Sequence, residues 1–123
     1  MTLPDFLLAD PASPEWRSPL RRALAQAPPE IADVTALAGP DEELALGPRA
    51  GIAGIEIRHA PFVHALLRRV TDLDLERLPA VGAVAHVRAL VQQPDPQRFR
   101  IWFAQEYADY LAEVVLDTHE GLA

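Results

Sequence analysis

Cysteine is absent from the 123 residues of this chain, and lysine is absent as well. Without cysteine there are no disulfide bonds, no thiol catalysis and no thiolate metal sites. Without lysine there is no Schiff-base chemistry and no lysine clamp for a phosphate group. All eleven basic residues are therefore arginines. Two explanations are open: a GC-rich genome that favours arginine codons, or the use of forked arginine donors at an interface with another protein.

Excess basic charge and long apolar runs are also missing. The net charge of −7 argues against binding to nucleic acid, which is driven by displacing counterions with basic residues. No apolar run approaches the length of a membrane span, and residues 1–5 have neither the basic segment nor the apolar run of a signal peptide. Because 50% of the residues are apolar and 24% are charged, we expect a globular protein. From the net charge and the missing signal-peptide and membrane-span patterns, we expect a cytoplasmic protein that binds neither nucleic acid nor membranes.

Proline is concentrated near the N-terminus. Residues 1–19 contain four of the twelve prolines together with the apolar residues Phe6, Leu7, Leu8 and Trp16. Proline at this density favours an extended path, and the apolar content is too high for a segment that stays in water. We predict an extended proline-rich arm over residues 1–19, which packs across its own domain or on another chain, and a single α+β domain over residues 20–123.

Hydrophobic periodicity predicts the elements of that domain. Ser18 and Pro19 are typical of the first positions of a helix, here a short one over residues 20–25. The remaining pattern predicts strands over 31–37, 43–46 and 51–58, a helix over 61–70, a long strand over 81–92, a strand over 97–103 and a helix over 104–117. Two helices on one face of a mainly antiparallel sheet make up a ferredoxin-like α+β fold, which is the architecture that we expect.

The last strand and the last helix have two-sided patterns. One side of the strand consists of Phe99, Ile101 and Phe103, and the other consists of Arg98, Arg100 and Trp102. The apolar side of the helix consists of Tyr107, Tyr110, Leu111, Val114 and Val115, and its acidic side of Glu106, Asp109, Glu113, Asp117 and Glu120. We interpret the acidic stripe as the solvated side of the helix, with contact to an arginine-rich partner as the alternative.

No pattern in the sequence is typical of catalysis. His59 and His64 are five residues apart, the wrong spacing for two metal ligands on one helical face. We interpret His86 as a strand residue and His119 as a side chain near the negative end of the last helix. The glycines within residues 47–54 are followed neither directly by a helix nor by a lysine, which argues against a phosphate or dinucleotide loop. We therefore predict no catalytic, metal-binding or cofactor-binding residue in this chain.

Trp102 lies on the same side of its strand as Arg98 and Arg100. Tryptophan and arginine are the residue types most enriched at protein interfaces. This side of the strand is covered either by the N-terminal arm of the same chain or by another protein. We predict contacts with a partner for the following residues: Phe6, Leu7, Leu8, Trp16, Arg98, Arg100 and Trp102.

Several of these segments resemble a known family. The strand and helix start over residues 98–115, which include Ala-Gln-Glu-Tyr-Ala-Asp-Tyr-Leu, are similar to the C-terminal end of the gamma subunit of heterotetrameric sarcosine oxidase. Asp74 and Leu75, followed by the strand over 84–91, resemble the family's Leu-Asp-Leu loop and the strand after it. Ser18-Pro19-Leu20 resembles a motif near the family's start. The chain departs from the family in lacking a tryptophan within residues 39–44.

The resemblance implies a non-catalytic accessory subunit of a multi-subunit flavoprotein oxidoreductase that oxidises an N-methylated amine or amino acid in one-carbon metabolism. It also implies that FAD, FMN, NAD and tetrahydrofolate bind to larger flavoprotein and folate-domain subunits and not to this chain. The implied fold is similar to part of the folate-binding aminomethyltransferase fold. The alternatives are a free-standing ferredoxin-like module that self-associates and binds a small molecule, and a small enzyme.

Overall fold

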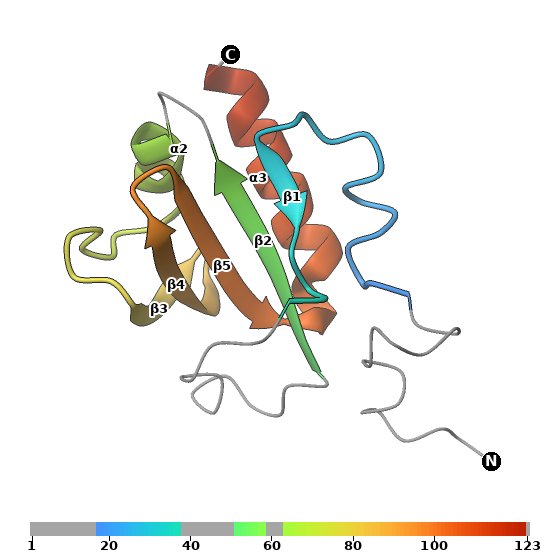
Figure 1. Cartoon of the computed structure of the whole chain (residues 1–123), viewed down its shortest axis with the longest axis horizontal. Helices are drawn as coiled ribbons and strands as arrows, with labels where there is room; N and C mark the ends of the chain where they lie inside the picture. The colour runs from blue at the N-terminus through green and yellow to red at the C-terminus, as the bar shows by residue number, and fades with distance from the viewer. Residues whose placement is uncertain (1–16, 38–50, 59–62, 123) are drawn as a thin grey trace.

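One antiparallel sheet organises the computed structural model, which describes residues 17–37, 51–58 and 63–122. In this part of the chain the five strands are β1 (Ile31–Asp33), β2 (Ile52–Arg58), β3 (Ala80–Val84), β4 (Val87–Asp95) and β5 (Arg98–Ala104). They pair in the order β1-β2-β5-β4-β3 (Figure 1). Helix α2 (Val63–Val70), the short 3₁₀ helix η3 (Gln105–Tyr107) and helix α3 (Ala108–Leu122) complete an α+β fold.

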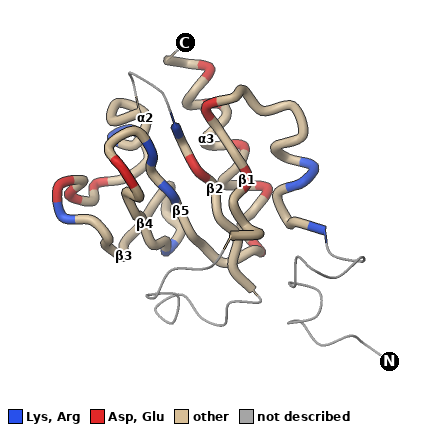
Figure 2. The backbone as a smooth tube through the Cα atoms, viewed as in Figure 1, with Lys and Arg blue, Asp and Glu red and all other residues tan. Residues whose placement is uncertain are grey.

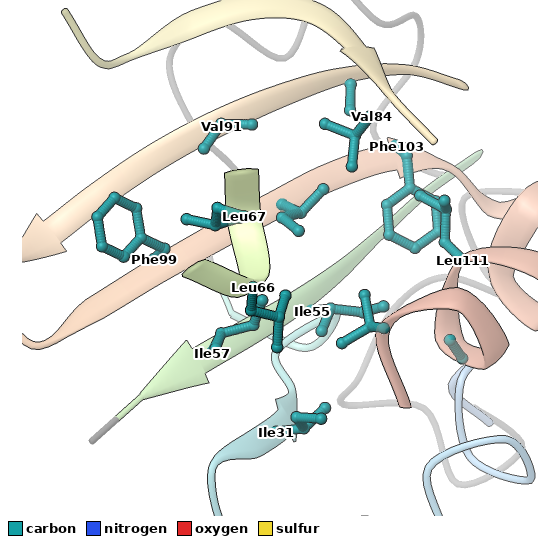
Figure 3. Packing of buried hydrophobic residues seen from close by; sticks show 14 of the residues in the cluster. Ile31, Ile55, Ile57, Leu66, Leu67, Val84, Val91, Phe99, Phe103 and Leu111 are labelled. Carbon is teal, nitrogen blue, oxygen red and sulfur yellow. The ribbon is translucent and has the colours of Figure 1, made fainter. Parts of the chain in front are cut away.

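Both α helices cover the same face of the sheet. Ile55 and Ile57 of β2 and Phe99 of β5 belong to one buried cluster with Leu66 of α2 and Leu111 of α3. Figure 3 shows these side chains between the strands and the helices. Each fully buried side chain of this size contributes about 1.5–3 kcal/mol relative to an exposed one. The alternation predicted for residues 51–58 and 97–103 is therefore confirmed on this face.

The opposite face of the sheet has a smaller apolar cluster. It consists of Val34, Ile52, Leu90 and Trp102, with Val81 packed against it. As a result β2 is buried on both faces, from Ile52 through Ile57. Beyond this cluster, towards the end of β2 and the start of β5, the same face is polar.

The single long strand predicted over residues 81–92 is wrong. The structure has a hairpin here, in which Val84 pairs with Val87 across a two-residue turn. The turn residues Ala85 and His86 have φ angles of 49° and 70°. Two positive φ angles are the geometry of a type I′ turn, which usually has asparagine or glycine at these positions. Because alanine and histidine are not turn signals, the apolar run reads as one strand, and His86 lies in the turn.

Residues 20–25 form a series of turns, and the predicted short helix is wrong. The Leu20 amide donates to the Ser18 hydroxyl at 3.1 Å, as expected for a helix start. However, the following bonds include three-residue spacings, such as the Ala25 amide to the Arg22 carbonyl at 3.3 Å. The six residues from 20 to 25, followed closely by Pro28, are too few to offset the cost of nucleating a helix.

The predicted strand over 31–37 is shorter than expected. It ends at Asp33 because the Asp33 carboxylate accepts the Thr35 amide at 3.0 Å and turns the chain. The predicted strand over 43–46 lies outside the described residues, as do the first residues of the helix predicted over 61–70 and most of the predicted arm.

The predicted apolar side of the last helix needs a correction. The buried residues of α3 are Ala108, Leu111, Ala112 and Val115, whereas Tyr107 and Tyr110 are exposed. Small alanines face the sheet, and the larger tyrosines lie at the margin of the buried stripe. The five acidic residues are all exposed, so their interpretation as the solvated side of the helix is confirmed. Among the described helices none is long and apolar enough to cross a membrane.

Candidate functional site

Glu56 is the residue around which the polar part of the sheet is organised. It lies in β2 between Ile55 and Ile57, and because strand side chains alternate it points away from the helices. It is only 2% exposed, and the other buried polar residue among those described is Thr71. A buried carboxylate is costly unless it is paired with opposite charge and hydrogen-bonded. The identity of its neighbours therefore matters.

Three arginines converge on this carboxylate. Arg100 Nε donates to Glu56 Oε1 at 2.9 Å. Arg98 Nη1 lies 3.5 Å from the same oxygen, and Arg58 Nε lies 3.1 Å from Oε2, in an ion pair whose alignment is too poor for a hydrogen bond. We call these four residues the arginine cluster.

Strand pairing explains why the arginine cluster forms. In the β2–β5 register Glu56 lies opposite Arg100, and Arg58 lies opposite Arg98. Figure 2 shows the basic and acidic segments of these two strands next to each other. Residues opposite each other on antiparallel strands lie within about 5.5 Å, so opposite charges at these positions stabilise the pair.

Asp95 holds Arg98 from the other side. Its Oδ2 accepts a hydrogen bond from Arg98 Nε at 2.6 Å, and its Oδ1 accepts the Gln97 amide at 2.8 Å. The hydrogen bond to Asp95 raises the pKa of Arg98 above its ordinary value. The carboxylate is thus used both to shape the β4–β5 turn and to orient the guanidinium of Arg98.

Trp102 lies on the same face but is part of the interior. Its indole Nε1–H donates to Gln92 Oε1 at 2.7 Å, and its ring covers Gly54 of β2. The residue is 2% exposed, so very little of it is left for contact with a partner. Val34, Ile52 and Leu90 of the same chain pack with Trp102, whereas most of the N-terminal arm lies outside the described residues, so cover of this face by the arm stays a prediction.

The outer edges of the arginines remain accessible. The side chains of Arg58, Arg98 and Arg100 are 35%, 36% and 20% exposed. A hollow of about 560 Å³ lies against Arg58 and Arg98, and a separate one of about 210 Å³ lies against Arg100. With Glu56 and Asp95 counted, three positive and two negative charges leave a local excess of +1 in a chain of net charge −7. Fixed guanidinium forks of this kind bind carboxylate and phosphate groups.

The residues predicted to contact a partner lie in different places. Arg98 and Arg100 come together in the arginine cluster, and Trp102 is buried beside it. Four of the predicted residues lie outside the described part of the chain: Phe6, Leu7, Leu8 and Trp16. The predicted contacts with a partner stay predictions.

Sequence reasoning missed Glu56, Arg58 and Asp95. Glu56 and Arg58 have the two-residue spacing of one strand face, in a segment that is otherwise apolar. A lone carboxylate in such a strand, followed by an arginine on the same side, is the signal that was available. The pairing of β2 with β5, which brings Arg98 and Arg100 next to Glu56, could not be read from the sequence.

In residues 17–37, 51–58 and 63–122 no three histidine, cysteine, aspartate or glutamate side chains are grouped to hold a metal ion. No protein-family model matches the sequence, and a search of the curated proteins found no match either.

Proposed function

We propose that this chain is a non-catalytic accessory subunit that docks on an acidic surface of a larger protein through its arginine cluster. The single observation that carries the proposal is the convergence of Arg58, Arg98 and Arg100 on the buried Glu56. The expected partner is the flavoprotein subunit of a cytoplasmic, sarcosine oxidase-like complex. FAD, FMN, NAD and tetrahydrofolate would then bind to the larger subunits.

Preorganisation favours docking over a purely structural role. An exposed arginine loses much rotamer freedom when it contacts a partner, and this loss weakens binding. In the arginine cluster, Arg98 is already held by Asp95 at 2.6 Å and Arg100 by Glu56 at 2.9 Å. Both keep exposed edges, so they offer donors whose orientation is set before the partner arrives.

Charge supports the choice of an acidic surface. The face has a local excess of positive charge although the chain as a whole is acidic. An acidic partner would be repelled by the exposed carboxylates of α3 and attracted by the arginine cluster, which selects one orientation of docking. Arginine is also among the residues that dominate binding energy at interfaces.

The ferredoxin-like relationship belongs to the same proposal. It is supported by two helices on one face of an antiparallel sheet. The hairpin of β3 and β4 replaces one expected strand by two, so α2 leads from β2 to the opposite edge of the sheet. The similarity to part of the aminomethyltransferase fold rests on the family resemblance alone.

The test uses the tagged full-length chain, expressed in its native host and purified at low salt. We expect a stoichiometric complex with a larger, flavin-containing protein, identified by its flavin absorbance and by mass spectrometry. The flavin-containing protein should no longer co-purify with the Arg98→Gln variant. Arg77→Gln is the matched control, because Arg77 also pairs with an aspartate three residues earlier but lies outside the arginine cluster.

Two results would contradict the proposal. One is a chain that purifies alone, as a monomer or a self-associated module, under conditions that preserve complexes. The other is a complex that Arg98→Gln leaves intact while urea unfolding shows the variant to be folded.

A further inference from the structure

Another cavity, which shares no lining residue with the two hollows beside the arginine cluster, lies where the end of α2, the β3–β4 turn and the side of α3 meet. Its volume is about 410 Å³, within the range of small-molecule sites. Its polar wall includes Arg68, Arg69, Asp72, His86 and Tyr110, and Val114 contributes to its apolar wall.

The charges around this cavity are unbalanced. Its lining includes two arginines, Arg68 and Arg69, against one acidic residue, Asp72, and His86 adds an imidazole. Neither arginine makes an ion pair or hydrogen bond with another residue of the described part of the chain. Their donors are therefore available to an anion.

The position at the end of a helix opposes this preference only in part. The C-terminal carbonyls of α2 are partly negative and would repel an anion if they were open. Two of them are already used: the Leu67 carbonyl accepts the Thr71 amide at 2.9 Å, and the Val70 carbonyl accepts the Ala85 amide at 2.7 Å.

The turn that places His86 at the cavity is strained. Ala85 and His86 both have positive φ angles, which L-residues with a Cβ disfavour. Hydrogen bonds hold this geometry: Tyr110 donates its hydroxyl to the Ala85 carbonyl at 3.0 Å, and Thr71 donates to the Ala83 carbonyl at 2.8 Å. Glycine or asparagine would form the same turn with less strain. Backbone strain of this kind concentrates at ligand sites, where a particular side chain is needed.

We propose that this cavity binds a small organic oxyanion, a carboxylate or a phosphate monoester with a compact apolar body. The oxyanion accepts hydrogen bonds from Arg68, Arg69 and His86, and the apolar body packs on Val114 and the ring of Tyr110. The site is separate from the arginine cluster, so it stands or falls independently of the docking proposal.

The experiment is a titration of the full-length, ¹⁵N-labelled chain with phenyl phosphate, benzoate and inorganic phosphate, followed by amide chemical shifts. We expect saturable shifts at Thr71, Asp72 and His86. Phenyl phosphate binding most tightly would assign a phosphate monoester, and benzoate binding most tightly would assign a carboxylate. Arg69→Gln should weaken binding about tenfold, the effect of losing a charged hydrogen bond. Arg77→Gln should leave it unchanged.

His86→Gly separates a binding role from a structural one. Removing the strain should raise the urea midpoint of unfolding, while loss of the imidazole weakens binding severalfold. The proposal is overturned if none of the three anions saturates below about 10 mM, which is weaker than a specific small-ligand site requires. It is equally overturned if Arg98→Gln abolishes the shifts and Arg69→Gln does not, because the anion would then occupy the arginine cluster.

Discussion

The contact between Gly54 and Trp102 allows a quantitative prediction for Gly54→Ala. A Cβ added at Gly54 would lie 2.6 Å from both Cε3 and Cζ3 of Trp102. Carbon atoms in optimal contact are about 3.5–4.0 Å apart, so the ring would have to move by about 1 Å. Its hydrogen bond to Gln92 and its packing with Val34 and Leu90 oppose that movement.

The expected loss of stability follows from two opposing terms. Overpacking of a well-filled interior costs about 1–3 kcal/mol. Replacing glycine by alanine also stabilises by about 0.4–1 kcal/mol, because the unfolded chain loses conformational freedom. We therefore expect Gly54→Ala to lower the free energy of unfolding by about 1–2 kcal/mol.

The assay is urea unfolding at equilibrium, with the free energy extrapolated linearly to water. Gly51→Ala is the control, since a Cβ at Gly51 meets no atom within 4 Å. It should be neutral or slightly stabilising. A double-mutant cycle with Trp102→Leu tests the mechanism: removing the large ring should make Gly54→Ala less costly.

The reasoning would be refuted if Gly54→Ala were as stable as the wild type or more stable. Trp102 would then not lie over β2, and the interpretation of this side chain as a contact for another protein would regain its basis. The contact between the added Cβ and the Trp102 ring would also be refuted if Gly54→Ala lowered the free energy of unfolding as expected but Trp102→Leu did not reduce that loss.

Three further predictions concern buried or paired polar groups. Glu56→Ala should lower the free energy of unfolding, measured in urea, by about 2–3 kcal/mol, because it leaves three neighbouring arginines without their shared carboxylate. A loss below about 1 kcal/mol would count against the arginine cluster. Thr71→Val should lower the free energy of unfolding by about 1–2 kcal/mol, since the Thr71 hydroxyl donates to the Ala83 carbonyl and accepts from the Leu73 amide. Thr71→Ser keeps the hydroxyl and should retain most of the stability, so equal effects of the two variants would disprove the role of the hydroxyl. Asp95→Asn should lower stability by the same amount at every pH from about 7 to 10, because the hydrogen bond to Asp95 raises the pKa of Arg98 and the guanidinium stays protonated throughout this range. The contribution is lost only at higher pH, as the pH rises through that raised pKa, so a difference that shrinks between about pH 7 and 10 would contradict this direction.

Local pattern determined the parts of the fold in which burial follows chain periodicity. Phe99, Ile101 and Phe103 lie on one side of β5 as their alternation predicts, because successive strand residues point to opposite faces. The acidic residues of α3 are exposed for the corresponding reason at helical period. These elements needed no knowledge of their neighbours.

Tertiary structure decided which side chains on the second face are covered. Trp102 has the same two-residue spacing as Arg98 and Arg100, yet it is buried because β5 pairs with β2 in the register that places it over Gly54. The same register brings Arg100 opposite Glu56, 44 residues away in the chain. Nothing within either strand encodes that pairing.

The β3–β4 hairpin and the candidate cavity depended on tertiary structure for another reason. Ala85 and His86 have no local preference for positive φ, and contacts from Val70 and Tyr110 hold them there. The sequence by itself determined the α+β class and the solvated side of the last helix. Register and long-range hydrogen bonds, which no local period contains, decided where the arginines and the candidate cavity lie.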